Sequence, residues 1–274
     1  HGHAACQQPA LVLEHPGGAQ DRKNELWRIR LANFRITGNE KSGHGIEARL
    51  VNEIFIEGVT VSYHGGDGIR LDRCYEDPRI CDSLITYNRG TGLNLIGCHD
   101  IVVASNQFEE NQDALHCTDG YNLTMSGNAL DDHLGHGVVI ENTYGSVVAA
   151  NMIEECAGTA IILDRDCYGI TLSANVIAHN MSGGIDLRDV LQGLPQDEVR
   201  GVGIHADLLR PPPIAAVTPS RLEAALAPAL LPSSLSSPAD DTARCVRRPR
   251  FTPSRLTPAP SPFAAPAGSV TTAA

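Results

Sequence analysis

Aromatic side chains are scarce in this sequence, at 4% of 274 residues, and lysine occurs only twice, at Lys23 and Lys41. So few large rings exclude a wide core filled by aromatic residues and favour a narrow one built from Val, Ile and Leu. No apolar run approaches the roughly 18 residues that span a bilayer, so no membrane-spanning segment is expected. The formal net charge of −11 argues against nucleic acid as a partner, because binding its phosphates requires a basic surface.

Glycine is abundant, with 26 residues, and much of it belongs to an internal repeat. A small residue followed by an aliphatic residue and an alternating strand pattern recurs at offsets of 23, 24, 22, 23, 23 and 24 residues. The small residues are Gly45, Gly68, Gly92, Ala114, Gly137, Ala160 and Gly184. A repeat this short cannot bury its own apolar face, so its copies must stack. The sequence therefore predicts an all-β fold, a parallel β-solenoid of about 7–8 coils.

A second phrase precedes the later copies by eight or nine residues and places Asn106, Asn128, Asn151 and Asn175 in one column, with Ser83 one coil earlier. Each coil therefore carries at least two strands. We interpret the column as a structural ladder of stacked amides at a turn, with the asparagines themselves in the left-handed conformation that turns require.

Three segments are expected along the chain. Residues 1–25 form a partial coil at 10–14 followed by an insertion, and residues 26–190 form the solenoid. Residues 191–274 form a tail rich in Pro, Ala and Ser, which has no Asn, Lys or Tyr from 211 onward. That composition is typical of a disordered segment, and out-of-frame translation of GC-rich DNA would give the same mixture. We expect its deletion to leave the solenoid stable. The chain begins at His1, so we expect a mature form or a fragment.

The eight cysteines include no Cys-x-x-Cys pair, so no zinc site is expected. Cys74 and Cys98 occupy equivalent places in adjacent coils, about 4.8 Å apart if the strands are in register. The pair is either a disulfide or, as we favour, two buried thiols stacked along the core.

Strand alternation separates core from surface. The inward rows begin with Ile46 and Ala48, and the outward rows begin with Glu47 and Arg49. The position before the small residue forms a further row, His44, Asp67, Thr91, Asp113, His136, Thr159 and Gly183. Acids, histidines and arginines on these outward rows suit a sugar chain laid along the axis. The predicted contacts are Arg70, His116, Glu141, Asp164 and Arg165.

The repeats over residues 26–190 resemble the right-handed parallel β-helix proteins of the pectin-lyase-like superfamily, whose members include polysaccharide hydrolases, lyases, epimerases and non-catalytic surface proteins. Residues 111–115, Asn-Gln-Asp-Ala-Leu, and 135–138, Gly-His-Gly-Val, resemble two strands of polygalacturonases. That resemblance implies a catalytic carboxylate at Asp113 and an assisting His136. The family's second adjacent Asp is replaced by Ala114, and its Arg-x-Lys motif has no match after His136.

A hydrolase needs a second carboxylate, and Asp67 lies two coils from Asp113, roughly 9–10 Å away from strand spacing. This suits the ~6.5–9.5 Å of inverting glycosidases. A lyase or epimerase would instead use Arg70, Arg165 or His116, with Ca²⁺ held by the acids. No dedicated metal loop is present in the sequence.

Structural roles compete with each of these assignments. Asp67 precedes a glycine and suits a turn, His133 and His136 can cap backbone groups, and Asp131-Asp132 fits a solvated turn. Asp164, Arg165 and Asp166 fit a surface salt-bridge cluster.

The preferred function is a secreted, periplasmic or cell-surface polysaccharide hydrolase or lyase acting on an acidic or plant- or algal-type glycan. The alternative is a non-catalytic glycan-binding or assembly module, which an exposed Val139 and Ile162 would favour. The sequence does not indicate an oligomeric state.

Overall fold

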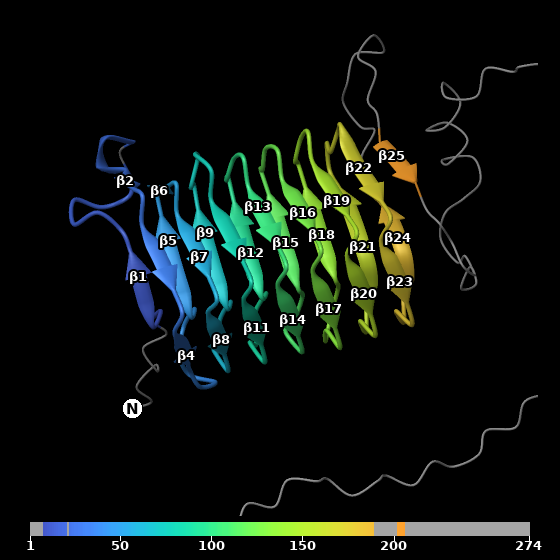
Figure 1. The fold of residues 1–274 in the computed structure, drawn as a ribbon, viewed down its shortest axis with the longest axis horizontal. Helices are drawn as coiled ribbons and strands as arrows, with labels where there is room; N and C mark the ends of the chain where they lie inside the picture. Colours follow the sequence, from blue (N-terminus) through green and yellow to red (C-terminus); the bar gives the residue numbers. More distant parts are fainter. Residues whose placement is uncertain (1–7, 21, 189–201, 206–274) are drawn as a thin grey trace, which may run out of the picture. The chain divides into compact units, whose positions relative to one another are not determined.

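A computed structural model describes residues 8–20, 22–188 and 202–205 of the chain. In these residues the chain winds as stacked coils whose strands form three parallel sheets (Figure 1). This arrangement confirms the prediction of a parallel β-helix. Each complete coil contributes three strands, one to each sheet, where the sequence indicates at least two.

The first sheet carries the strand of the repeat phrase. Its members, in order, are β1 (Leu11–Leu13), β5 (Ile46–Arg49), β9 (Ile69–Asp72), β12 (Leu93–Ile96), β15 (Leu115–Thr118), β18 (Val138–Glu141), β21 (Thr159–Asp164) and β24 (Gly183–Leu187). The pairing is in register throughout, so Ile46 lies beside Ile69 and Leu93 beside Leu115. The seven small residues consequently form one line along the axis, as the period predicts.

The other two sheets complete each coil. The second contains β3 (Arg30–Ala32), β7 (Phe55–Glu57), β10 (Arg79–Cys81), β13 (Val102–Ala104), β16 (Thr124–Ser126), β19 (Val147–Ala149), β22 (Ile170–Ser173) and β25 (Val202–His205). The third contains β4 (Arg35–Thr37), β8 (Thr60–Ser62), β11 (Leu84–Thr86), β14 (Gln107–Glu109), β17 (Ala129–Asp131), β20 (Met152–Glu154) and β23 (Val176–Ala178). A short pair, β2 (Leu26–Trp27) and β6 (Val51–Asn52), and a 3₁₀ turn, η1 (Arg22–Asn24), lie near the start.

The first and last described strands extend the helix in different ways. β1 pairs with β5, with Leu11 opposite Ile46, which is the place expected for an eighth strand phrase at residues 10–14. β25 pairs with β22, so the parallel arrangement reaches residues 202–205, beyond residue 190 where the repeat phrases stop. The rest of the tail, and the expectation that its deletion is harmless, lie outside the described residues.

The core is the stack of inward side chains. Ile46, Ile69, Leu93, Leu115, Val138 and Ile161 are fully buried, and so are their partners two residues on from Ala48 to Leu163. In the last coil of the described solenoid the core is less buried: Ile185 and Leu187 are only half-buried. Close approach of neighbouring coils explains why the position before the first inward row holds a small residue. A Cβ atom on Gly45 would lie 2.5 Å from the carbonyl oxygen of Gly68 in the next coil.

The asparagine column is a hydrogen-bonded ladder inside the wall of the helix. The Oδ1 atom of Asn128 accepts the backbone N–H of Asn106 at 2.9 Å and its amide at 3.0 Å. The amide of Asn128 in turn donates to Asn151 Oδ1 at 2.9 Å. The left-handed residue at this corner is not the asparagine but the residue before it, such as Ser105 or Ala150, with φ of 58° and 56°. This position corrects the expectation that the asparagines themselves occupy the left-handed conformation.

A second ladder, which the sequence analysis does not identify, runs along the next corner through His64, Asn88, Asn111, His133, Cys156 and Asn180. Asn111 Oδ1 accepts the backbone N–H of Asn88 at 3.1 Å, and His133 Nδ1 accepts that of Asn111 at 3.2 Å. His133 is 1% exposed, and its Nε2 atom has no hydrogen-bond partner among the described residues. Burial lowers the pKa of His133 to about 4. His133 is therefore a structural, neutral member of this ladder.

Cys74 and Cys98 are both buried and free, so the stacked-thiol interpretation is correct and the disulfide is not present. Desolvation raises the pKa of Cys98 well above its usual value, and raises that of Cys117 to about 12. These thiols are therefore core side chains with little thiolate character.

Candidate functional site

The residues predicted to act on a sugar lie on the outward face of the first sheet or at the entry to its strands. Asp67, Asp113 and His136 each stand directly before the small residue that opens a coil's strand. Arg70 lies on β9, His116 on β15 and Glu141 on β18, while Asp164 ends β21 and Arg165 follows it. The face therefore places polar side chains one coil apart along the helix axis.

The entry row is itself a ladder of hydrogen bonds between coils. Asp67 Oδ1 accepts the backbone N–H of Thr91 at 2.9 Å, and Asp113 Oδ1 accepts that of His136 at 2.5 Å. His136 Nδ1 accepts the backbone N–H of Thr159 at 2.9 Å. Each of the three predicted catalytic side chains thus satisfies a strand-entry N–H group of the following coil.

Asp113 and His136 are neighbours, but their side chains do not pair. The Asp113 carboxylate bonds the backbone of His136, and the imidazole is directed to Thr159 through Nδ1. Both residues are half-buried, and within the described part of the chain this bond is the one hydrogen bond of the Asp113 carboxylate.

Asp67 is the centre of a denser network. It is 8% exposed, and its Oδ2 atom accepts the amide of Asn94 at 2.9 Å. The same oxygen lies 3.3 Å from His44 Nδ1 and 3.7 Å from a terminal nitrogen of Arg70. His44 Nδ1 already accepts the backbone N–H of Asp67, so the entry ladder begins one coil earlier.

The network continues toward the first coil through residues that the site prediction omits. Glu47 is 4% exposed, and its Oε1 atom lies 2.8 Å from Arg49 and 3.7 Å from Arg70. Arg49 also reaches Glu14 at 2.7 Å, and that hydrogen bond raises the pKa of Arg49. The signal for Glu47 and Arg49 is present in the sequence, because both belong to the same outward rows as the chosen residues.

Farther along the axis a second group forms around Glu141. Its two oxygens lie 3.6 Å from His116 Nε2 and 3.3 Å from Arg165. Asp164 is the strand neighbour of Glu141, and its Oδ1 atom accepts the backbone N–H of Arg165 at 2.7 Å. The structure thus brings four of the five predicted contact residues together, and places the fifth, Arg70, beside Asp67.

Two apolar positions on the outward row are not open to solvent. Val139 is 7% and Ile162 is 1% exposed. The exposed apolar surface that would favour a pure binding module is therefore absent at these two residues.

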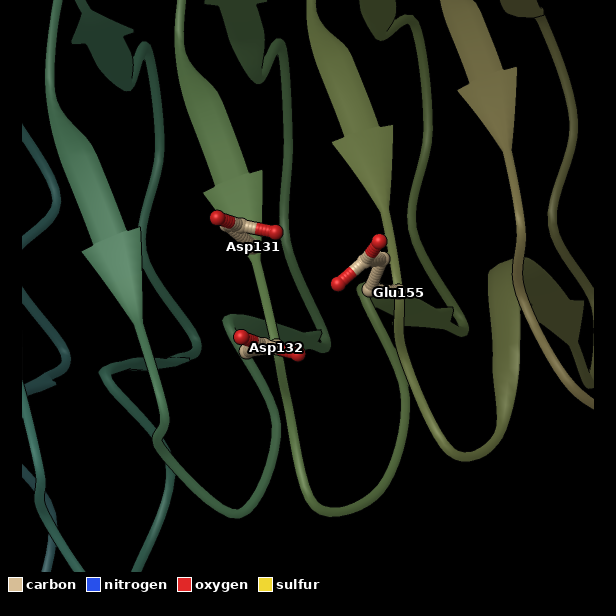
Figure 2. A group of neighbouring side chains, drawn as sticks. All are labelled: Asp131, Asp132 and Glu155. Atoms are coloured by element: carbon tan, nitrogen blue, oxygen red, sulfur yellow. The ribbon is translucent and has the colours of Figure 1, made fainter. Parts of the chain in front are cut away.

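A cluster of carboxylates lies away from this face, at the end of the third sheet's strands. Asp131 ends β17, Asp132 follows it, Glu155 follows β20, and one oxygen of each lies within 4.8 Å of the others (Figure 2). Ca²⁺ usually takes six to eight oxygen ligands, so three carboxylates at a half-exposed turn are a sparse set for it.

A family model described as the right handed beta helix region matches residues 20–190. This chain belongs to that family. The match agrees with the stacked coils and fixes their hand as right-handed. No helix in the described part of this β-helix is long and apolar enough to cross a membrane.

No curated protein matches the chain. Several solved structures match the chain at low identity. The periplasmic alginate epimerase AlgG is 16% identical with a TM-score of 0.49, over 65% of this chain and 46% of that one. The Streptococcus pneumoniae surface protein and adhesin PfbA is 16% identical with a TM-score of 0.44, over 66% and 55%. A tailspike protein from an Escherichia coli O157:H7 bacteriophage is 13% identical with a TM-score of 0.44, over 72% and 35%. The chain spans about half or less of the length of these proteins.

Proposed function

We propose that this β-helix acts on a polysaccharide laid along its first sheet, and that it hydrolyses the chain. The observation that carries the proposal is the line of hydrogen-bonding side chains at one-coil intervals, from Arg49 through Asn94 to Glu141. A sugar polymer presents hydroxyl groups at regular intervals, so a regular array of donors and acceptors can bind several units at once. Neither a membrane nor a nucleic acid offers such a partner to a face rich in carboxylates.

Asp67 and Asp113 fit the two roles of an inverting hydrolysis. Asp67 accepts two hydrogen bonds and lies near His44 and Arg70, which suits the base that activates water. Asp113 accepts a single hydrogen bond, which leaves its second oxygen to protonate the leaving oxygen. Their separation of two coils, roughly 9–10 Å, leaves room for that water.

The charges of the face favour a neutral glycan over the acidic one expected from the sequence. Each arginine on or beside the first sheet's strands lies within hydrogen-bonding or ion-pair distance of a carboxylate: Arg49, Arg70, Arg73, Arg165 and Arg188. A uronate would have to compete with those carboxylates, while the hydroxyls of a neutral plant- or algal-type glycan can bond to the pairs as they stand. This assignment also makes Ca²⁺-assisted lyase or epimerase chemistry less suited to the face.

The entry ladder favours the alternative, a non-catalytic glycan-binding module in a secreted, periplasmic or surface protein. Asp67, Asp113 and His136 all serve as acceptors for the backbone, which accounts for their presence without catalysis. Both functions predict that the protein binds a glycan, and only the hydrolase predicts that it cleaves one.

The experiment is a panel of neutral and acidic polysaccharides incubated with the protein, with reducing ends and the ultraviolet absorbance of unsaturated products measured in parallel. Hydrolysis gives new reducing ends without that absorbance, a lyase gives both, and a binding module gives neither. Asp113→Asn keeps an oxygen for the His136 N–H group, so the fold should persist while hydrolysis falls by two or more orders of magnitude. Asp131→Asn, at a solvated turn, is the matched control and should be fully active. Wild-type rates in Asp113→Asn would refute the assignment.

A further inference from the structure

All six tyrosines of the chain lie at its surface in two groups, although aromatic residues are rare elsewhere. Tyr63 and Tyr87 form a pair, which we call the tyrosine pair. The other four join one histidine in a longer row that follows the strands of the first sheet. We call this row the aromatic column: Tyr75, His99, Tyr121, Tyr144 and Tyr168. Parallel bridges join His99, Tyr121, Tyr144 and Tyr168 in turn, and the ring of Tyr75 contacts His99, so each of five consecutive coils carries one ring.

The rings of the two groups are oriented differently. In the tyrosine pair the planes meet at 2° with centroids 4.9 Å apart, so each ring covers a face of the other. In the aromatic column the spacing is similar, from 4.2 to 5.1 Å, but the first three pairs meet at 65°, 64° and 59° and the last at 38°. Rings so inclined cannot cover one another face to face. Successive rings in the column therefore meet edge to face or at a tilt.

The rings of both groups are partly exposed. Tyr121 and Tyr168 in the column are each 42% exposed, and Tyr63 and Tyr87 in the pair are 47% and 36% exposed. At the first ring, the guanidinium of Arg22 lies 4.6 Å from the centroid of Tyr75, over its face. The guanidinium of Arg22 covers this face of Tyr75, so a ring of the column can hold a group over its face.

Planar polar side chains flank the rings. Asn122 donates to Asp100 at 2.7 Å, Asn142 donates to Asp119 at 2.6 Å, and the hydroxyl of Tyr144 donates to Asn142 at 2.7 Å. Both asparagine–aspartate pairs join adjacent coils and are exposed. The column is therefore a strip of aromatic surface with amide and carboxylate groups beside it, and the charge beside its central rings is negative.

We propose that the aromatic column binds a neutral polysaccharide chain lying along the helix axis, at a site separate from the polar face of the first sheet. The face of an aromatic ring carries partial negative charge and attracts the polarised C–H bonds on the face of a sugar ring. The flanking amides and carboxylates bond to the hydroxyls at the edges of that sugar. Asp100 and Asp119 repel uronate and sulfated chains, and single-stranded nucleic acid as well. A column of five coils can engage several sugar units, so affinity should rise with chain length.

Stacking that only ties the coils together is the competing explanation, and the tyrosine pair serves as its internal control. Both groups stabilise neighbouring coils through ring contacts worth about 0.5–1.5 kcal/mol each. Both groups have exposed rings, but only the column extends over five coils along the axis. A binding role therefore predicts that substitutions in the two groups change stability to a similar extent, but that only those in the column weaken ligand binding.

The test uses the full chain and three soluble neutral polysaccharides as probes, hydroxyethyl cellulose, arabinoxylan and galactomannan, with polygalacturonate and alginate as acidic counterparts. Affinity gel electrophoresis and titration calorimetry measure binding, and thermal unfolding measures stability. Tyr121→Leu should weaken binding of the retained neutral probe at least tenfold, whereas Tyr121→Phe keeps the ring and should bind within threefold of wild type. Tyr87→Leu, in the tyrosine pair, should bind as wild type.

Four results would overturn the proposal: no retention by any neutral probe, stronger retention by the acidic ones, equal affinity in Tyr121→Leu and wild type, or a loss of binding in Tyr87→Leu that matches the loss in Tyr121→Leu. The last result would assign both groups to structure alone. The proposed hydrolysis fails independently, because it depends on Asp113. Asp113→Asn should be inactive yet still bind through the column, and Tyr121→Leu should retain turnover on short oligosaccharides that do not reach the column.

Discussion

Replacing His133 by asparagine should remove a large part of the protein's acid sensitivity. His133 occupies a ladder position that Asn88 and Asn111 fill in the two preceding coils, and there the amide nitrogen also donates to a carbonyl of the adjacent coil, as Asn111 does to Ile85 at 2.8 Å. His133 supplies the acceptor but leaves Nε2 buried without a partner among the described residues. An asparagine would supply both the acceptor for the backbone N–H and the donor to the carbonyl, and its side chain does not titrate.

The size of the effect follows from linkage. The pKa of His133 is about 4 in the folded protein because burial disfavours the charged ring, against 6.5 for an ordinary histidine. Between those values the unfolded chain binds a proton that the folded chain does not, so stability falls as pH drops from about 6.5 to about 4. The difference of roughly 2.5 units corresponds to a loss of about 3 kcal/mol at the acid end. Above pH 6.5 the His133 ring is neutral in both the folded and the unfolded chain, so none of this stability is lost.

The assay is denaturant unfolding of wild type, His133→Asn and His179→Asn at intervals from pH 7.5 to pH 4. His133→Asn should lie within about 1 kcal/mol of wild type at neutral pH and exceed it by about 2–3 kcal/mol near pH 4.5. His179 is exposed at a left-handed position that asparagine tolerates, so its variant should follow the wild-type curve. Parallel pH curves for wild type and His133→Asn would refute the reasoning.

Three further predictions follow from the wall and core of the helix. Asn128→Ala should cost about 2–4 kcal/mol of unfolding free energy, because it leaves a backbone N–H and a carbonyl of neighbouring coils buried without partners, and denaturant titration would show it. Gly68→Ala should cost about 1–3 kcal/mol, because its Cβ atom would lie 2.7 Å from the next coil's carbonyl oxygen, and a melting temperature unchanged within error would contradict the clash. Cys117, whose pKa burial raises to about 12, should resist alkylation at pH 8 until denaturant is added, as mass spectrometry of the labelled peptide would show; modification in the native state would disprove its burial.

Much of the candidate site could be placed from the sequence, because strand register converts offsets of 22 to 24 residues into spatial neighbours. Glu141, Asp164 and His116 lie where the outward rows predict them. The rows do not show which atoms of each side chain already make hydrogen bonds to neighbouring coils. Asp113 and His136 are adjacent as expected, yet the carboxylate bonds the backbone and the imidazole bonds the coil beyond.

For the aromatic column, too, the sequence gives the positions of the residues and the structure gives their orientation. Tyr121, Tyr144 and Tyr168 are spaced by one coil, so the sequence already aligns them. It cannot distinguish a column inclined at 64° from a pair stacked at 2°, because ring orientation depends on the packing of each turn.

The sequence by itself determined the coil period, the inward rows, the line of small residues and the first asparagine ladder. Each of these follows from local chemistry repeated at a constant offset, and repetition makes every coil predict the next. Only the tertiary structure decided the third strand of each coil, the second ladder through His133, the burial of Ile162 and the tilt of the tyrosine rings. Those features depend on which backbone groups of neighbouring coils are left unsatisfied and which side chains cover them, and such contacts exist only once the coils are stacked.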